Sequence, residues 1–127
     1  MMRDQEKLYE TLGELLYVVA KVDGVIQDEE VASLNKLLEK HPWGKEVQWS
    51  FNYEVAKNSS MEEIYHKVVS YCHSHGPSPI YQEFIDAMNT IAEAANGVED
   101  SETEIIESFS ADLMERFRKD IEKRYEV

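Results

Sequence analysis

Residues 15–38 read LLYVVAKVDGVIQDEEVASLNKLL, and this stretch predicts the fold because it holds the end of one apolar helix and the start of the next. The first helix is expected to end near Val22, where Asp23-Gly24 breaks the pattern, and an apolar series resumes after the acids at 28–30. Glycine supplies the left-handed backbone that ends a helix, and Asp28 is expected to cap the second one. We therefore predict a helix-turn-helix corner with an acidic joint.

The same helical spacing of apolar residues continues on both sides of this corner. Proline and glycine breaks and two Ser-x-x-Glu capping signals divide the pattern into further helices. The expected helices run over about Asp4–Val22, Glu29–Lys40, Ser60–His75, Pro79–Asn96 and Ser101–Arg124. The chain is thus predicted to be one all-α domain, residues 1–127, of about six or seven helices.

The segment from Trp43 to Asn58 has the weakest signal. Its residues from Trp49 to Val55 alternate as in a strand, but no second strand-like run exists to pair with them. A lone strand cannot satisfy its backbone hydrogen bonds. We therefore expect a short helix or irregular cover here, with both tryptophans shielding the core.

Composition excludes several classes of function. The 127 residues hold 26 acids and 13 bases, a formal charge of −13, which is repelled by nucleic acid and by anionic lipid. Cys72 is the single cysteine, so no intrachain disulfide forms. The charged start MMRDQEKLYETL has no apolar leader and no run reaches membrane-spanning length, so we expect a cytoplasmic protein without direct membrane insertion.

The negative charge is unevenly distributed along the chain. Between Lys67 and Arg116 there is no Lys or Arg, and ten acids lie there: Glu83, Asp86, Glu93, Glu99, Asp100, Glu102, Glu104, Glu107, Asp112 and Glu115. Such a run is either a solvated face or a patch for cations or for a basic partner. The sequence leaves both readings open.

The acidic corner has a second, weaker copy near the C-terminus. Residues 19–30, with an Asp-Gly break, are echoed by residues 92–102, in which Asn96-Gly97 is the break. The second copy is one residue shorter between its glycine and its last acid. This internal repeat predicts a pseudo-twofold arrangement of two helix pairs.

The pattern Ala20-x-x-Asp23-Gly24-x-Ile26-x-x-x-Glu30, with Asn96, Gly97 and Glu102 as its second copy, resembles the TerB-like (tellurite resistance B) family. The resemblance covers about Leu8 to Phe117. It implies an all-α, roughly twofold fold without established enzymatic activity, in a setting of resistance to tellurite and other chemical stress. It also implies a metal site on the acids of the repeats, at Asp23, Glu30 and Glu102. Asn96 departs from the pattern because it offers a neutral oxygen.

The residues themselves allow a shared cation site at the two joints. The run from Asp23 to Glu30 matches the back half of a calcium-binding EF-hand loop, but Val19 and Lys21 stand where its first two acids should be. A site for calcium or a similar divalent cation would therefore need Asp23, Glu30, Asn96 and Glu102 together. The alternative is that these side chains only cap helices.

A second candidate metal site lies on the expected helix after Ser60, where Glu62, His66 and His73 share one face near Cys72 and His75. It lacks any specific zinc spacing, and histidines near a helix C-terminus are explained by the helix dipole. The sequence has no phosphate-binding loop and no nucleophile elbow, so we predict no enzyme and no certain cofactor.

These observations predict a non-catalytic acidic interaction module, linked to a divalent cation and acting on an unknown protein partner. The resemblance implies that the module is of the TerB-like type and acts in a stress response. The alternative is an immunity-type inhibitor that masks a basic enzyme, since opposite charge speeds encounter. That reading expects one exposed acidic patch from Glu83 to Glu115 centred on Tyr81. A cation buffer or sensor would instead bring the two joints together.

Overall fold

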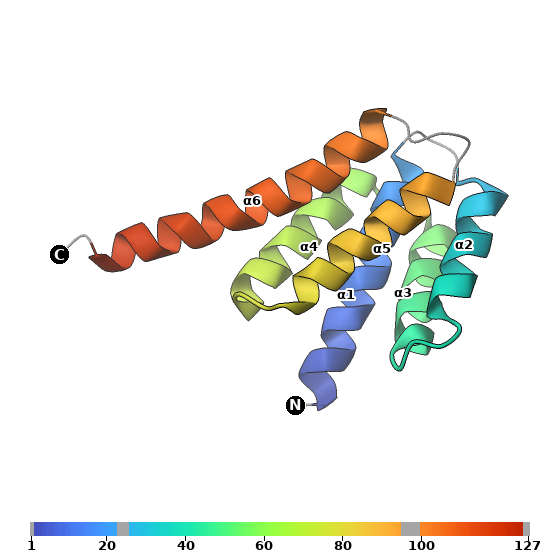
Figure 1. Cartoon of the computed structure of the whole chain (residues 1–127), viewed down its shortest axis with the longest axis horizontal. Coiled ribbons are helices and arrows are strands. Elements are labelled where there is room, and N and C mark those ends of the chain that lie inside the picture. Colours follow the sequence, from blue (N-terminus) through green and yellow to red (C-terminus); the bar gives the residue numbers. More distant parts are fainter. Residues whose placement is uncertain (1, 23–25, 95–99, 126–127) are drawn as a thin grey trace.

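The structure is a computed structural model that describes residues 2–22, 26–94 and 100–125, without the side chains of 2–4, 94, 100–102, 124 and 125. Within these ranges the chain forms six helices and no strand (Figure 1). They are α1 (Met2–Lys21), α2 (Asp28–Leu38), α3 (Gly44–Lys57), α4 (Met61–His75), α5 (Ile80–Ala94) and α6 (Asp100–Tyr125). The predicted all-α class is confirmed.

Helix α1 is the centre of the fold. Every residue from Thr11 to Ala20 is buried, because α3, α4 and α5 all pack against this helix. Tyr17 and Val18, which follow Leu15 and Leu16 around the helix, are therefore in the core as well. A helix that is apolar around most of its circumference is stable only in such surroundings. The Tyr17 hydroxyl remains satisfied by donating to the carbonyl of Ser59 at 2.8 Å.

The contact between α1 and α3 is unusually close at Gly13. A Cβ atom on Gly13 would lie 2.4 Å from the carbonyl oxygen of Val47 and 2.8 Å from the Cβ of Ser50. One turn away, the Ser50 hydroxyl donates to the carbonyl of Glu10 at 2.6 Å, which ties the two backbones together. The missing side chain of Gly13 therefore sets the distance between these helices.

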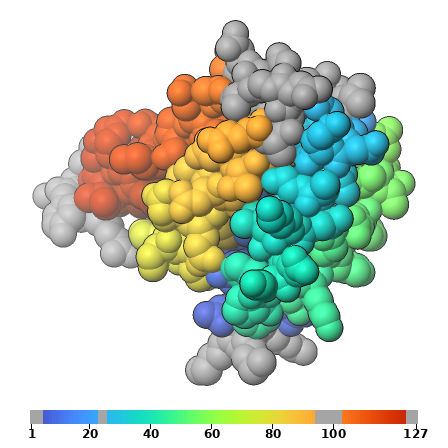
Figure 2. Space-filling model, turned by 45° about the vertical axis from the view of Figure 1, so that its right-hand side comes forward, coloured from blue at the N-terminus to red at the C-terminus, as the bar shows by residue number. Residues whose placement is uncertain are grey.

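Helix α6 differs from the others in its exposure. Its first half packs on α4 and α5 through Ile106, Phe109 and Leu113, which are buried. Its last turns extend beyond the ends of the other helices (Figure 1). Figure 2 shows the first half lying beside α5, with α2 on the other side of α5. The side chain of Ile121 is 58% exposed and lines a hollow with Gly76 and Pro77.

The structure of residues 43–58 differs from the prediction made for this segment. Residues 44–57 form the complete helix α3, four turns long, and not a short helix or irregular cover. The strand-like alternation from Trp49 to Val55 misled because α3 buries the helical series Val47, Ser50, Phe51 and Glu54 against α1. Asn58 ends the helix in the left-handed conformation, with φ 52°.

The cap of α2 also differs from its prediction. Asp28 is the first residue of the helix, and Gln27 is the capping position. The three acids do lie in the first turn of α2, as expected.

The internal repeat stays a prediction, because residues 23–25 and 95–99, which form its two breaks, lie outside the described residues. No helix in the described part of the chain has the length and apolar character needed to cross a bilayer.

Candidate functional site

Two aromatic side chains stand on the outer side of α3. Trp49 and Tyr53, one turn apart, are 61% and 49% exposed, and their rings stack with centroids 5.5 Å apart and planes 22° apart. The Lys57 ammonium lies 5.7 Å from the centre of the Tyr53 ring. Because α3 turns its other side to α1, these rings cannot reach the core. Exposed tryptophan and tyrosine are the side chains that most often anchor protein interfaces.

Carboxylates surround one side of this aromatic pair. A hollow of about 390 Å³ beside Trp49 is lined by Glu6 and Glu10 of α1 and by Lys45 and Glu46 of α3. Three acids, against Lys45 in this hollow and Lys57 on the Tyr53 ring, leave a net charge of −1. We call Trp49, Tyr53, Glu6, Glu10 and Glu46 the aromatic face. It combines an apolar anchor with a charged rim, which is the usual anatomy of an interface.

A small polar cluster joins α1, α3 and α4, in which Glu14 and Glu54 are buried and the Lys67 side chain is 66% exposed. Lys67 donates from Nζ to Oε2 of Glu14 at 2.7 Å. Burial raises the pKa of Glu14, the Lys67 ammonium opposes that rise, and the nearby Glu54 and Glu10 carboxylates add to it. Among the described atoms, Oε2 of the buried Glu54 has no hydrogen-bond partner. Within the part of the chain that the structure describes, Lys67 pairs with Glu14 alone, so the carboxylates of this cluster outnumber its lysine.

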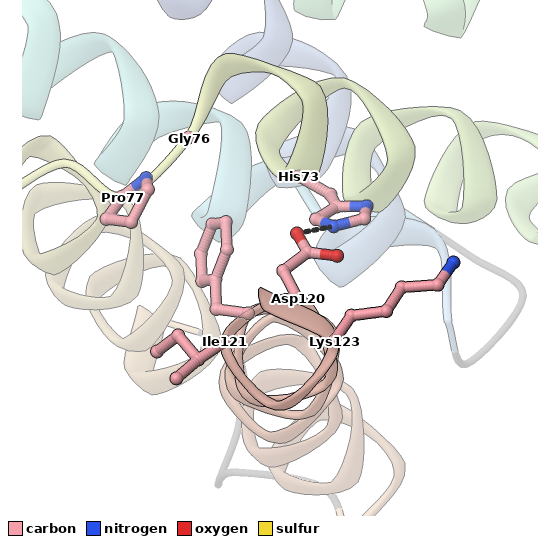
Figure 3. Close-up of a pocket in the computed structure, with 7 residues that line it drawn as sticks. His73, Gly76, Pro77, Asp120, Ile121 and Lys123 are labelled. Atoms are coloured by element: carbon pink, nitrogen blue, oxygen red, sulfur yellow. Dashed lines mark hydrogen bonds and ion pairs between the residues drawn. The ribbon is translucent and has the colours of Figure 1, made fainter. Parts of the chain in front are cut away.

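A second hollow lies where α6 leaves the body, and we call it the α6 groove (Figure 3). It measures about 580 Å³ and is lined by His73, Gly76, Pro77, Phe117, Asp120, Ile121 and Lys123. His73 Nε2 lies 2.7 Å from Oδ2 of Asp120, and the imidazole meets the Phe117 ring edge-on with centroids 5.7 Å apart. These two contacts hold the second half of α6 against the end of α4.

The predicted cation ligands are only partly described. Asp23, Asn96 and the side chain of Glu102 lie outside the described residues. Glu30 is buried, and its Oε1 accepts a hydrogen bond from the backbone amide of Gln27 at 2.9 Å. This is the reciprocal half of a capping box, so at least one carboxylate of the joint closes the start of α2. The shared cation site remains a prediction.

The histidine group of α4 is described in full. His66 and His75 are exposed, while His73 faces Asp120. Over the described ranges, no group of three or more His, Cys, Asp or Glu side chains is placed to hold a metal ion. Burial raises the pKa of the Cys72 thiol to about 12. The thiol therefore stays protonated at neutral pH and packs as a small apolar side chain.

Tyr81 is not the exposed anchor that an inhibitor reading expected. It is 8% exposed, and its hydroxyl donates to the carbonyls of Cys72 and Gly76 at 2.9 and 2.7 Å. Its role is to close the turn between α4 and α5. The acids of the run that are described remain exposed on α5 and α6: Glu83, Asp86, Glu93, Glu104, Glu107, Asp112 and Glu115.

Sequence reasoning missed the aromatic face because it placed both tryptophans over the core. Only Trp43 fits that description, since it is half-buried and stacks on Tyr9 with centroids 5.8 Å apart. The spacing of Trp49 and Tyr53 by four residues was a usable signal once the segment is read as a helix. No family model, curated protein or solved structure matches this chain.

Proposed function

We propose that this chain is a non-catalytic interaction module of the TerB-like type that binds a basic protein partner through the aromatic face. The observation that carries the proposal is the exposed Trp49–Tyr53 stack beside three carboxylates. The family and its stress-response setting rest on the motif resemblance at residues 20–30 and 96–102.

The free energy available from burying Trp49 supports the use of the aromatic face as a binding surface. Covering the exposed 61% of Trp49 removes roughly 150 Å² from water, worth about 4 kcal/mol at 25 cal/mol per Å². Association entropy takes part of that gain, so a net effect of about 2 kcal/mol, or thirtyfold in affinity, is expected for this side chain.

The charge of the partner follows from the rim and from the whole chain. Glu6, Glu10 and Glu46 place negative charge next to an indole ring, and guanidinium groups bind both features, by ion pairing and by cation–π contact. The net charge of −13 attracts a basic partner before contact is made. An arginine-rich surface therefore suits this face best.

Calorimetry with an arginine hexapeptide tests the proposal, with a glutamate hexapeptide as the probe of opposite charge. We expect saturable binding of the arginine peptide that weakens with added salt and falls about thirtyfold in Trp49→Ala. Met114→Ala, which removes a similarly exposed apolar side chain from α6, is the matched control and should bind as the unmodified chain does. Equal binding by Trp49→Ala would refute the assignment to this face.

The inhibitor alternative expected a patch from Glu83 to Glu115 centred on Tyr81, but Tyr81 is buried, so it too is tested at the aromatic face, and it differs in what the partner does. A module leaves the partner's activity intact, whereas an immunity-type protein occludes the active site of a basic enzyme. Titrating a cationic nuclease with the protein and with Trp49→Ala separates the two: stoichiometric inhibition lost in the variant supports the inhibitor, and binding without inhibition supports the module.

The cation-linked form of the proposal rests on Asp23, Asn96 and Glu102, with Glu30 capping α2. Because Glu30 is buried, its removal would disturb the fold, so Asp23→Asn and Glu102→Gln are the better variants. Chelator-treated protein should show saturable binding of calcium, magnesium, manganese or zinc that both variants weaken. Asp28→Asn, one residue along the same acidic start, is the control.

A further inference from the structure

We propose that this chain forms a twofold dimer in which the α6 helices of two copies pack antiparallel along an exposed seam. The seam consists of Glu107, Ala111, Met114, Arg118 and Ile121. These residues follow one another at intervals of four, three, four and three, so they share one side of α6. All five are exposed.

The seam is separate from the side of α6 that packs on the body. Ile106, Phe109 and Leu113 face α4 and α5 and are buried, whereas Met114 and Ile121 are 69% and 58% exposed. The projecting last turns of α6 make this side accessible to another molecule (Figure 1). A helix that presents one apolar-centred seam to its own core and another to solvent is built to pack on two sides.

The charges on α6 favour a second copy of the same helix as the partner of the seam, packed antiparallel to the first. From Asp100 to Glu115, α6 carries six acids and no base, whereas from Arg116 to Tyr125 it carries five bases and two acids. Antiparallel packing places the acidic half of each helix against the basic half of the other. Parallel packing would place like charges together, which is destabilising.

The seam itself has a complementary register. When Glu107 of one copy meets Arg118 of the other, Ala111 of the first copy meets Met114 of the second, so a small side chain faces a large one. The same two contacts then repeat by symmetry, as a twofold interface requires. Ile121 lies at the end of the seam and borders the α6 groove.

The distribution of charge makes the second half of α6 the surface where two copies of the protein repel each other least. Residues 1–113 hold 22 acids and 8 bases, whereas residues 114–127 hold 4 acids and 5 bases. Contact through the acidic body would bring strongly negative surfaces together. Contact along residues 107–121, which hold 4 acids and 3 bases, avoids most of that repulsion.

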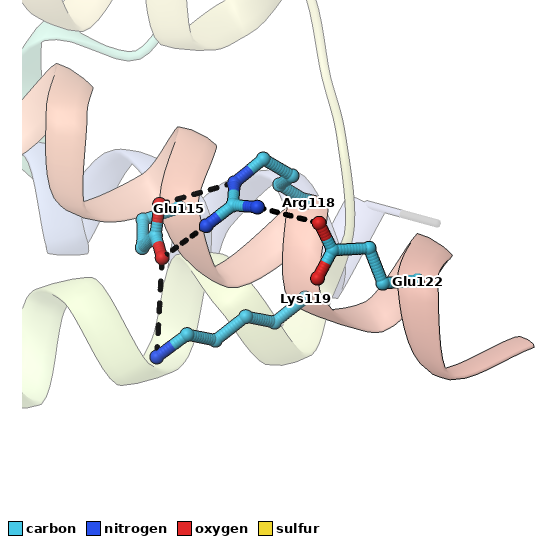
Figure 4. A network of polar contacts seen from close by, with 4 residues as sticks. All are labelled: Glu115, Arg118, Lys119 and Glu122. Atoms are coloured by element: carbon cyan, nitrogen blue, oxygen red, sulfur yellow. Dashed lines mark hydrogen bonds and ion pairs between the residues drawn. The ribbon is translucent and has the colours of Figure 1, made fainter. Parts of the chain in front are cut away.

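Arg118 is already held in position before any contact (Figure 4). Its guanidinium donates to Glu115 Oε1 at 2.6 Å and to Glu115 Oε2 at 3.2 Å, and it also pairs with Glu122. The carboxylates lie three residues before it and four after it, so they fix its stem along the helix. An ordered arginine loses less freedom when a further carboxylate joins it.

Sedimentation of the full chain across a concentration series up to about 1 mM tests the dimer. We expect the mass to rise from 14.8 kDa towards twice that value with concentration, and Met114→Glu to raise the dissociation constant at least about tenfold. Trp49→Glu, which adds the same charge to the aromatic face, should associate as the unmodified chain does. A mass of 14.8 kDa throughout the series would overturn the proposal, as would a dimer that Met114→Glu leaves intact.

A charge exchange within one chain tests the register. Arg118→Glu opposes Glu107 of the other copy, and Glu107→Arg opposes its Arg118, so each single variant should weaken the dimer. The double variant Glu107→Arg/Arg118→Glu restores opposite charges across the interface and should recover it. Loss of helix stability would not be repaired by a second change eleven residues away, so failure of the double variant to recover, with helicity intact by circular dichroism, would overturn the register.

Discussion

Gly13→Ala is expected to destabilise the protein by about 2 kcal/mol, although alanine favours helices. The added Cβ would lie 2.4 Å from the carbonyl oxygen of Val47 and 3.0 Å from the amide nitrogen of Phe51, so it would meet backbone that cannot rotate away. Overpacking of this kind costs up to about 3 kcal/mol, and the better helix propensity of alanine returns about 1 kcal/mol.

Chemical denaturation followed by circular dichroism measures this loss, and thermal unfolding should show a midpoint lowered by about 6–10 °C. Ala32→Gly, at an exposed position of α2, calibrates the propensity difference in the same protein and should lose about 0.5–1 kcal/mol. If Gly13→Ala were as stable as the unmodified chain, the close contact between α1 and α3 would not be a constraint on the fold, and the reasoning would be refuted.

Three further substitutions test other parts of the structure. Lys67→Met should cost about 1–3 kcal/mol at pH 7, because it leaves the buried Glu14 carboxylate without its cation. Since burial raises the pKa of Glu14 above 4.5, the loss should shrink as the pH falls through that raised pKa and Glu14 becomes neutral, which denaturation at several pH values would show. Tyr81→Phe removes two hydrogen bonds that close the turn between α4 and α5 and should lower the free energy of unfolding by about 1–2 kcal/mol. Asn58→Ala should cost about 1 kcal/mol, because alanine adopts the left-handed conformation at φ 52° less readily than asparagine, while Asn58→Gly should cost nothing in the same assay.

Much of the fold was predictable because it depends on local patterns. The expected break after Val22, the capping serine of α4 and the proline-rich turn before α5 all lie at helix ends in the structure. Ser60 Oγ accepts from the amide of Glu63 at 3.4 Å, as its capping signal predicts. The prediction for residues 43–58 was wrong because the alternation over seven residues is compatible with both a strand and a helix. Only the packing of Val47 and Phe51 on α1 distinguishes the two.

The candidate sites were less predictable, because exposure is decided by neighbours far along the chain. Tyr81 and Trp49 are both aromatic residues in polar surroundings of sequence, yet one closes a turn inside the protein and the other stands in solvent. Tyr81 precedes Phe84 and Ile85 at helical spacing, whereas the spacing of Trp49 from Tyr53 becomes informative only once residues 44–57 are known to be a helix. The carboxylate of Glu14 and the ammonium of Lys67, 53 positions apart, meet only after α1 and α4 have packed.

By itself, the sequence determined the helical class, the positions of most helix ends and the sign of the surface, since periodicity, capping and charge act over a few residues or over the whole composition. Only the tertiary structure decided that α1 is buried on nearly all sides, that Gly13 spaces it from α3, and that α6 projects with a second exposed seam. The physical reason is that burial is a property of what lies opposite a side chain, and helices that are distant in sequence provide it.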